Sequence, residues 1–361
     1  MNTDMDVRVS RHSVFPIEDY DRYVGDSPRA TPYHASAWLQ AIEKAYGHTA
    51  WIVSGHRGGA LCGVLPLVEV RRPIGQPILV SLPFCDLAGP LADEPALEER
   101  LVQAARDLAR TNGIARLQVR SGGRAVAPEA IAAGDARDKV RMLMPLPRTS
   151  ADLFQSFKPK LRSQVRKAEK NGLTSQVRTD PEALDPFYRV FSANMRRLGS
   201  PVHSRSWFRE LQRSYGERLL VGLVHLGDTP VGAGIVLIQG DRASIPWAST
   251  LAEHNHLAPN MLLYWTLLSR VCDSGCREFD FGRSTLGEGT YRFKKQWGAV
   301  AHELIWRDGG VADDASAGTR SPATGGGWMS GLRPLVELLW SRLPPGLVNW
   351  LGPKLRRYIT L

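Results

Sequence analysis

Charged and aromatic side chains gather in one stretch of the chain, residues 278–298 (EFDFGRSTLGEGTYRFKKQWG). The stretch begins as a strand, because Phe279 and Phe281 alternate with polar residues or glycine. Three glycines then favour a loop, and a cationic, aromatic run, YRFKKQW (291–297), follows. Loops that carry such groups on a rigid sheet often hold functional sites. We therefore expect the chemistry of this protein here.

These residue types suit the transfer of an acyl group to an amine. Attack by the amine creates an oxyanion and releases a proton, so the protein must align the partners and stabilise both charges. Lys294 can supply positive charge to the oxyanion or to a substrate diphosphate, and Arg283 can hold a phosphate through two parallel hydrogen bonds. Asp280 is a candidate proton acceptor. Further candidates for substrate contact are Tyr291, Arg292 and Trp297.

A structural interpretation is open beside the chemical one. Taken singly, each of these residues is more commonly structural: Asp280 can cap a loop or pair with Arg283, and Trp297 can belong to the core. The density of the cluster favours the chemical interpretation. No Ser-His-Asp spacing indicates a covalent nucleophile, and we expect no metal site.

Composition sets broader limits. The 361 residues carry a net charge of +10, which favours anionic partners such as phosphates, nucleic acid or an anionic membrane. Four cysteines are too few and too scattered for a disulfide framework. The N-terminal residues lack an apolar signal core, and no apolar run is long enough to span a bilayer. We expect a cytoplasmic protein.

Hydrophobic periodicity predicts two successive rounds of strands and helices. The expected fold is α/β (α+β), with two tandem domains that each have a mixed, mainly antiparallel sheet flanked by helices. The expected domains are residues 1–145 and 146–307. Residues 308–327 are small, polar and glycine-rich, which indicates a flexible linker.

A basic helix is expected within residues 158–172 (KPKLRSQVRKAEKNG), which hold six cations and one acid. A solvated helix face and a phosphate-contacting surface explain this pattern equally well. In the second case, Arg162 and Arg166 would contact the substrate.

The tail, residues 328–361, differs from the rest of the chain. Its leucines fall on two helical stripes separated by Pro344 and Pro345, and three tryptophans, one tyrosine and five cations accompany a single acid. Such a helix suits the surface of an anionic membrane. A tail packed on its own domain or on a partner is an equal alternative.

Several motifs between residues 33 and 306 are similar to a known family. The chain resembles the FemAB-like branch of the GNAT acyltransferase superfamily, and within it the proteins found alongside exosortase (PEP-CTERM) and exopolysaccharide gene clusters. The most specific motifs are FDFGRS (279–284) and YRFKKQWGA (291–299). Weaker ones are SLPFCDLAGP (81–90), LRSQVRKAEKNGL (161–173), RLGSPVHSRSWF (197–208) and APNMLLYW (258–265).

The resemblance implies two GNAT-like domains and a bacterial cell-envelope function. Well-understood family members transfer an amino acid from aminoacyl-tRNA to a peptidoglycan precursor. Their phosphate- and substrate-contacting lysine maps onto Lys294, and their acidic residue in an early loop maps onto Asp86. The chain lacks the long helical arm of the staphylococcal tRNA-using members. It also lacks the RxxGxG/A loop with which GNAT enzymes bind the pyrophosphate of coenzyme A.

Three functions follow as hypotheses. The first is an acyl- or aminoacyltransferase that forms an amide on a cell-envelope or exopolysaccharide precursor. The second is a CoA-dependent N-acetyltransferase acting on a sugar or protein amine, and the third is a non-catalytic protein that binds a glycan precursor. We expect no tightly bound cofactor, an acyl donor (aminoacyl-tRNA or acyl-CoA) as co-substrate, and an anionic precursor or glycan as partner. Through residues 328–361 the protein would also sit peripherally at the inner membrane.

Overall fold

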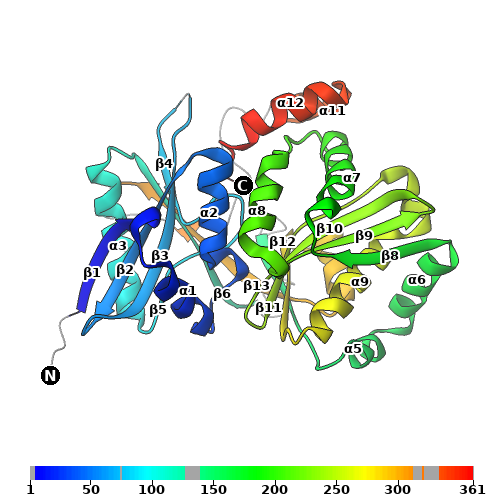
Figure 1. Cartoon of the computed structure of the whole chain (residues 1–361), viewed down its shortest axis with the longest axis horizontal. Coiled ribbons are helices and arrows are strands. Elements are labelled where there is room, and N and C mark those ends of the chain that lie inside the picture. The colour runs from blue at the N-terminus through cyan, green and yellow to red at the C-terminus, as the bar shows by residue number, and fades with distance from the viewer. Residues whose placement is uncertain (1–4, 74, 127–138, 312–318, 321–332, 361) are drawn as a thin grey trace. The chain divides into compact units, whose positions relative to one another are not determined.

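The computed structural model describes residues 5–73, 75–126, 139–311, 319–320 and 333–360, and divides the chain into two compact units (Figure 1). Unit 1 comprises Met1–Ala125, His302–Ala323 and Tyr358–Leu361, and unit 2 comprises Val126–Ala301 and Thr324–Arg357. These bounds differ from the expected division at residue 145, because β7 (Lys139–Pro145) lies in unit 2 and most of β13 (Val300–Gly310) in unit 1.

Unit 1 is built on a mixed sheet with the strand order β1-β2-β3-β4-β6-β13, where β5 also pairs with β3 and β14 with β13. The strands are β1 (Met5–Arg11), β2 (Thr49–Arg57), β3 (Ala60–Val70), β4 (Ile78–Val80), β5 (Leu91–Ala92), β6 (Arg116–Ala125), β13 and β14 (Thr319–Arg320). Its helices are α1 (Ile17–Asp26), α2 (Ser36–Tyr46) and α3 (Pro95–Thr111). Leu97 of α3 sits so close to Gly55 and Gly63 that a Cβ atom at either position would lie 2.8 Å from its methyl groups. These glycines let the helix approach the sheet.

In unit 2 the strands follow the order β7-β12-β11-β10-β9-β8. The strands besides β7 are β8 (Leu173–Arg178), β9 (Leu219–Leu226), β10 (Thr229–Gln239), β11 (Arg242–Thr250) and β12 (Glu278–Thr285). All neighbours in this order are antiparallel except β11 and β12, which are parallel. A parallel pair needs a crossover, and α9 (Pro259–Asp273) supplies it.

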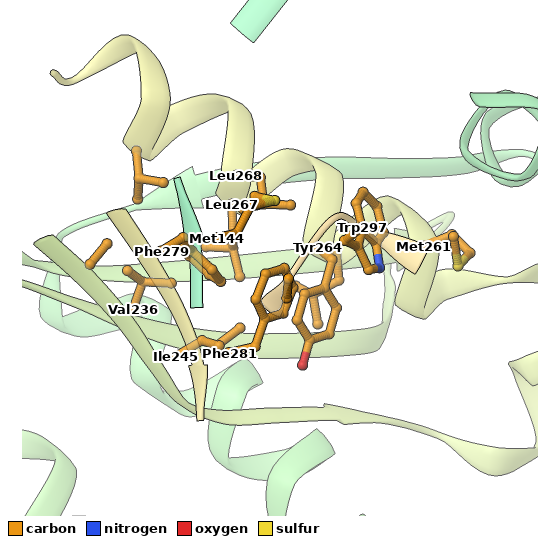
Figure 2. Close-up of a cluster of buried hydrophobic side chains, with 14 of the residues drawn as sticks. Met144, Val236, Ile245, Met261, Tyr264, Leu267, Leu268, Phe279, Phe281 and Trp297 are labelled. Carbon is orange, nitrogen blue, oxygen red and sulfur yellow. The ribbon is translucent and has the colours of Figure 1, made fainter. Parts of the chain in front are cut away.

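The core of unit 2 forms between α9 and this sheet. Tyr264, Leu267 and Leu268 of α9 meet Phe279 and Phe281 of β12, as Figure 2 shows. The ring of Tyr264 stacks on that of Phe281 at 5.6 Å. The remaining helices of the unit, apart from the tail, are α5 (Ser150–Ser156), α6 (Pro159–Lys170), α7 (Leu184–Arg197), α8 (Arg205–Tyr215) and α10 (Gly289–Gln296). The core therefore fixes β12, which carries Asp280 and Arg283 of the predicted site.

The predicted fold class is confirmed, since both units are mixed sheets flanked by helices. The strands β4, β5, β7, β8, β13 and β14 were not predicted. In β7, Val140, Met142 and Met144 stand at every second position and are buried, which is a pattern typical of a strand. In the expected linker, Asp308–Gly310 end β13 and residues 319–320 form β14; most of the remainder lies outside the described residues.

The tail forms two helices, α11 (Arg333–Arg342) and α12 (Pro345–Arg356), and one side of them packs on unit 2. Trp340 and Val348 are buried, and the Leu343 carbonyl accepts a hydrogen bond from Arg196 Nη1 at 3.3 Å. Another side is exposed and apolar, with Leu338, Leu339, Leu347, Trp350 and Leu355. No helix in the described part of the chain combines the length and the apolar character needed to cross a membrane.

The contact between the tail and unit 2 depends on a close approach at Gly199. This residue has φ +68°, and a Cβ there would lie 2.5 Å from the backbone oxygen of Glu337 in α11. Gly227 has φ +56° but nothing within 4 Å of such a Cβ. Alanine at Gly227 should therefore cost only the left-handed backbone term, about 1–2 kcal/mol.

We predict that Gly199→Ala lowers the free energy of unfolding of unit 2 more than Gly227→Ala does, and that it also loosens the tail. Urea denaturation would compare the stabilities, and limited proteolysis would report the release of α11 and α12. Equal stability losses with equal protease resistance would show that α11 does not pack against Gly199.

Candidate active site

The pairing between the parallel strands β11 and β12 is short. Only residues 242–244 of β11 pair with residues 278–280 of β12, although β11 continues to Thr250 and β12 to Thr285. The partner of β12 on its other side is β7, and that register shifts between Asp280 and Arg283. The strand therefore changes course immediately after Asp280, where most of the predicted site residues follow.

A buried ion pair holds this change of course. Asp280 is 3% exposed, and its Oδ2 accepts a hydrogen bond from Arg141 Nε of β7 at 2.8 Å. Its Oδ1 accepts the Gly282 N–H at 2.7 Å. Gly282 has φ +73°, a backbone conformation that favours glycine. Asp280 is thus engaged by a cation and by the loop, so it could take a proton from an amine only by giving up part of this pairing.

Lys294 binds the other side of the same loop through hydrogen bonds. It lies on α10, is 8% exposed, and its Nζ donates to the Arg283 carbonyl at 2.8 Å and to the Gly282 carbonyl at 3.2 Å. Lys294 thus ties α10 to two successive carbonyls of the loop. The structure therefore brings Lys294, Arg283 and Asp280 together, as the sequence predicts.

Two buried hydroxyl groups accompany this cluster. Ser244 lies opposite Asp280 in the β11–β12 pairing, and Ser284 follows Arg283 on β12. Within the described part of the chain, neither hydroxyl has a hydrogen-bond partner, and both side chains are buried. Buried polar groups are normally satisfied, so such unmatched hydroxyls are typical of sites that bind a ligand or water.

The other predicted residues of this stretch divide into two groups. Trp297 is 1% exposed and Tyr291 is also buried, and both belong to the core of unit 2. Trp297 packs edge-on against Phe157, with 5.3 Å between the ring centres, so it anchors the end of α10 on the core. Arg292 is exposed, and its Nε donates to the Gly287 carbonyl at 2.9 Å, which shapes the loop.

Asp86 belongs to unit 1, in a loop arranged around a buried arginine. Arg120 is fully buried, donates from Nη1 to the Cys85 carbonyl at 2.6 Å, and stacks on the Trp306 ring at 4.4 Å. The Asp86 carbonyl accepts the Trp306 indole N–H at 3.1 Å. Burial raises the pKa of the Cys85 thiol to about 12, so this cysteine stays protonated and is not a nucleophile.

The basic helix is α6, where Leu161, Val165 and Ala168 face the core. Arg162 is half-buried and Arg166 is exposed, with its guanidinium 5.4 Å from the centre of the Phe154 ring. Both arginines lie in unit 2. Among the described residues, no three His, Cys, Asp or Glu side chains form a potential metal site.

The N-terminus of α9 shows whether a pyrophosphate fits in unit 2. Helix N-termini bind phosphates through free N–H groups. Here the first helical residue is Pro259, which has no N–H, and the Met261 N–H already bonds the Ala258 carbonyl at 3.0 Å. The preceding segment, Ala252–Leu257, contains Glu253 and no glycine. This helix start therefore offers a pyrophosphate fewer N–H donors than a regular helix N-terminus does.

The family comparison agrees with this architecture. Residues 155–295 match the family model described as an acetyltransferase (GNAT) domain. The matched residues lie within unit 2. No curated protein sequence matches the chain.

Solved structures extend the similarity to both units. FemX has a TM-score of 0.64 at 16% identity, with 82% of this chain and 95% of that one covered. A tandem GNAT protein of the clavulanic acid biosynthesis pathway has a TM-score of 0.52 at 14% identity, covering 86% and 100%. The C-terminal domain of a putative lysylphosphatidylglycerol synthetase from Agrobacterium fabrum has 0.53 at 13%, covering 83% and 93%. At these identities the similarity shows the fold alone, and it confirms the predicted tandem GNAT arrangement.

Sequence reasoning missed Arg141, the partner of Asp280. The available signal was the spacing of Val140, Met142 and Met144 at every second position. It predicts a strand on which Arg141 points to the other face of the sheet. The partner itself could not be found from the sequence, since 139 positions separate the two residues.

We predict that Asp280→Asn and Arg141→Gln each lower the free energy of unfolding by about 3 kcal/mol or more, because each leaves one buried charge uncompensated. The double variant should lose much less than the sum of the two single losses. Chemical denaturation of the wild type, the two single variants and the double variant gives the free energies for this double-mutant cycle. Additive losses would show that the two side chains do not stabilise each other.

Proposed function

We propose that this protein is an N-acyltransferase that forms an amide on a cell-envelope or exopolysaccharide precursor. The observation that carries this proposal is the GNAT acetyltransferase match over residues 155–295, set within a tandem GNAT fold. The cationic cluster at the end of the β11–β12 pairing supports it, because acyl transfer requires fixed charges beside the reacting carbonyl.

In the proposed mechanism, each residue acts through its position in the structure. Lys294 offsets the negative charge that develops on the acyl oxygen, and Arg283 contacts a phosphate of the substrate. The Arg141–Asp280 pair is a positioning element that keeps the loop in place. The family resemblance suggests Asp86 of unit 1 as an acceptor for the proton of the attacking amine, directly or through a water. Tyr291 and Trp297 support α10 from the core, while Arg292, Arg162 and Arg166 extend the basic surface.

The donor that these residues favour is an aminoacyl-tRNA. Pro259 has no N–H and the Met261 N–H is already bonded, which reduces the donors at the start of α9 and argues against acyl-CoA, while the basic face of α6 suits an RNA backbone. The acetyltransferase description of the matching family model keeps a CoA-dependent N-acetyltransferase as the second candidate.

The proposed acceptor is an anionic envelope precursor. The net charge of +10 favours such a substrate, and the fold similarity includes FemX and a putative lysylphosphatidylglycerol synthetase. The motifs of residues 279–299 extend the proposal to systems that contain exosortase (PEP-CTERM) or exopolysaccharide clusters.

A donor assay tests the function. The purified protein would be incubated with a mixture of aminoacyl-tRNAs or with acetyl-CoA, together with lipid-linked and nucleotide-linked envelope precursors, and products would be found by mass. A mass increase by one aminoacyl residue supports the proposal. An acetyl increment supports the second candidate, and no product with any donor would contradict an enzymatic function.

We predict that Lys294→Met lowers kcat about 100-fold, because it removes the charge while it keeps most of the side-chain volume. Two carbonyls lose their donor, so a stability loss of about 1–3 kcal/mol should accompany it. Lys295→Met is the matched control, since Lys295 is the exposed neighbour on α10. Steady-state kinetics on folded protein would compare them. Similar kcat values for the two variants would remove Lys294 from the site.

We also propose that the tail attaches the protein to the cytoplasmic face of the inner membrane. The exposed side of α11 and α12 is apolar, Trp350 is 60% exposed, and Lys354 Nζ lies 3.5 Å from the centre of its ring. Apolar, aromatic and basic groups in this combination bind anionic bilayer surfaces. The other side of the tail packs on unit 2, so deletion of residues 328–361 would expose buried groups and is a poor test.

We predict that Trp350→Ser combined with Leu355→Ser abolishes pelleting with anionic liposomes while the melting temperature stays unchanged, because both side chains are exposed. Val14→Ser combined with Val300→Ser is the control, since it removes exposed apolar side chains elsewhere. Cosedimentation at low and high salt gives the measurement. Unchanged pelleting of the tail variant would rule out this attachment.

A further inference from the structure

A basic pocket lies in unit 2 beside the tail, at the end of β11 that does not pair with β12. It measures about 430 Å³, and its walls come from α7, the end of β11 with the residues that follow it, and the first residues of α8 and α12. In Figure 1, α12 is the red helix labelled next to α11. Four arginines line the pocket, and Glu253 is the one acid among its lining residues. The arginines are Arg189, Arg196, Arg197 and Arg205.

The arginines are held in place largely without being neutralised. Arg196 donates to the Leu343 carbonyl, and Arg197 Nη2 donates to Asn194 Oδ1 at 2.9 Å. Within the described part of the chain, Arg189, Arg196 and Arg197 have no carboxylate at ion-pair distance. Arg205 pairs with Asp185 at 2.5 Å and covers the Tyr188 ring at 4.3 Å. The pocket thus keeps about three positive charges for a ligand.

A cluster of several arginines is typical of a phosphate-binding site. The planar guanidinium group donates two parallel hydrogen bonds to phosphate oxygens, and several such groups together favour a dianion over a monoanion. Neutral donors in the wall, such as the Asn194 and Asn349 amides, can complete the coordination. The chemistry of the pocket is therefore that of a terminal phosphate or a diphosphate.

The surroundings indicate where this phosphate comes from. Val348 and Asn349 line the pocket, while Leu347 and Trp350, their neighbours on α12, are exposed. Leu338 and Leu339 of α11 are exposed as well. A ligand whose phosphate fills the pocket therefore has an apolar surface beside it, as a lipid headgroup with its acyl chains requires.

We propose that this pocket binds the phosphate of an anionic lipid that exposes a phosphomonoester or a diphosphate, while the outer side of α11 and α12 lies in the headgroup region. The proposal rests on the membrane attachment described above but not on acyl transfer. It adds headgroup selectivity to that attachment, because a flat basic surface responds to total charge whereas a pocket responds to the shape and charge of the phosphate.

Vesicle binding tests the selectivity. Wild-type protein would be cosedimented with phosphatidylcholine vesicles that contain phosphatidic acid or phosphatidylglycerol, at matched zeta potential. We expect a preference of about tenfold for phosphatidic acid, the factor that roughly one additional charge-assisted hydrogen bond supplies. The triple variant Arg189→Gln, Arg196→Gln, Arg197→Gln should lose this preference.

The matched control removes the same charge elsewhere on unit 2, through Arg209→Gln, Arg213→Gln and Arg270→Gln, which are exposed on α8 and α9. It should weaken binding to both vesicles but keep the ratio. Two results would overturn the proposal that the pocket recognises the phosphate. One is equal binding of the wild type to the two kinds of vesicle. The other is an equal loss, in both triple variants, of the preference for phosphatidic acid.

A measurement without vesicles tests the pocket independently of membrane attachment and of acyl-transfer activity. Dihexanoyl phosphatidic acid, below its micellar concentration, should raise the melting temperature of the wild type and of the Trp350→Ser, Leu355→Ser variant, but not that of the pocket variant. Glycerol 3-phosphate should have a smaller effect. An equal effect would assign the pocket to a soluble phosphate ester, and stabilisation by oligonucleotides alone would assign it to nucleic acid; either result would overturn the lipid proposal.

Discussion

The buried pair between Asp280 and Arg141 is the interaction on which the candidate site depends. Asp280 stands at the last residue where β12 pairs with β11, and its two carboxylate oxygens bind Arg141 and the Gly282 N–H. These hydrogen bonds hold the backbone where the register of β12 against β7 shifts, between Asp280 and Arg283. Lys294 then binds the carbonyls of Gly282 and Arg283 from α10. A network of two cations and one carboxylate thus sets the backbone of the loop.

Such a network is costly in isolation, because each ion gives up its hydration. The core of unit 2 makes the arrangement stable: Phe279 and Phe281 flank Asp280 in the chain and pack under α9, which fixes the strand before and after the carboxylate. The charges therefore sit on a rigid apolar layer, as a preorganised catalytic site requires. The unmatched hydroxyls of Ser244 and Ser284 lie in the same region.

The tail helices α11 and α12 have a packed side and an exposed side. One side of α11 and α12 covers the domain through Trp340 and Val348, and the other side presents leucines and Trp350 to the surroundings. Of the two alternatives that the sequence left open, packing on the domain is what the structure shows, and the exposed apolar side is the basis on which we propose attachment to a membrane. The basic pocket at the edge of α12 joins the packed side to the exposed side.

The sequence by itself determined the fold class and the place of the cationic cluster, because periodicity and motif order are local properties of the chain. Residues 278–285 formed the predicted strand β12 with a loop after it, whereas the cationic, aromatic run forms the helix α10, which was not predicted. Lys294 meets the backbone of Gly282 and Arg283, next to Asp280. Only the tertiary structure decided what each group touches. Arg141 reaches Asp280 from a distant strand, Trp297 is core, and the arginines of α7 and α8 meet α12 in a pocket. Such contacts depend on the packing of elements far apart in the chain, which no local pattern encodes.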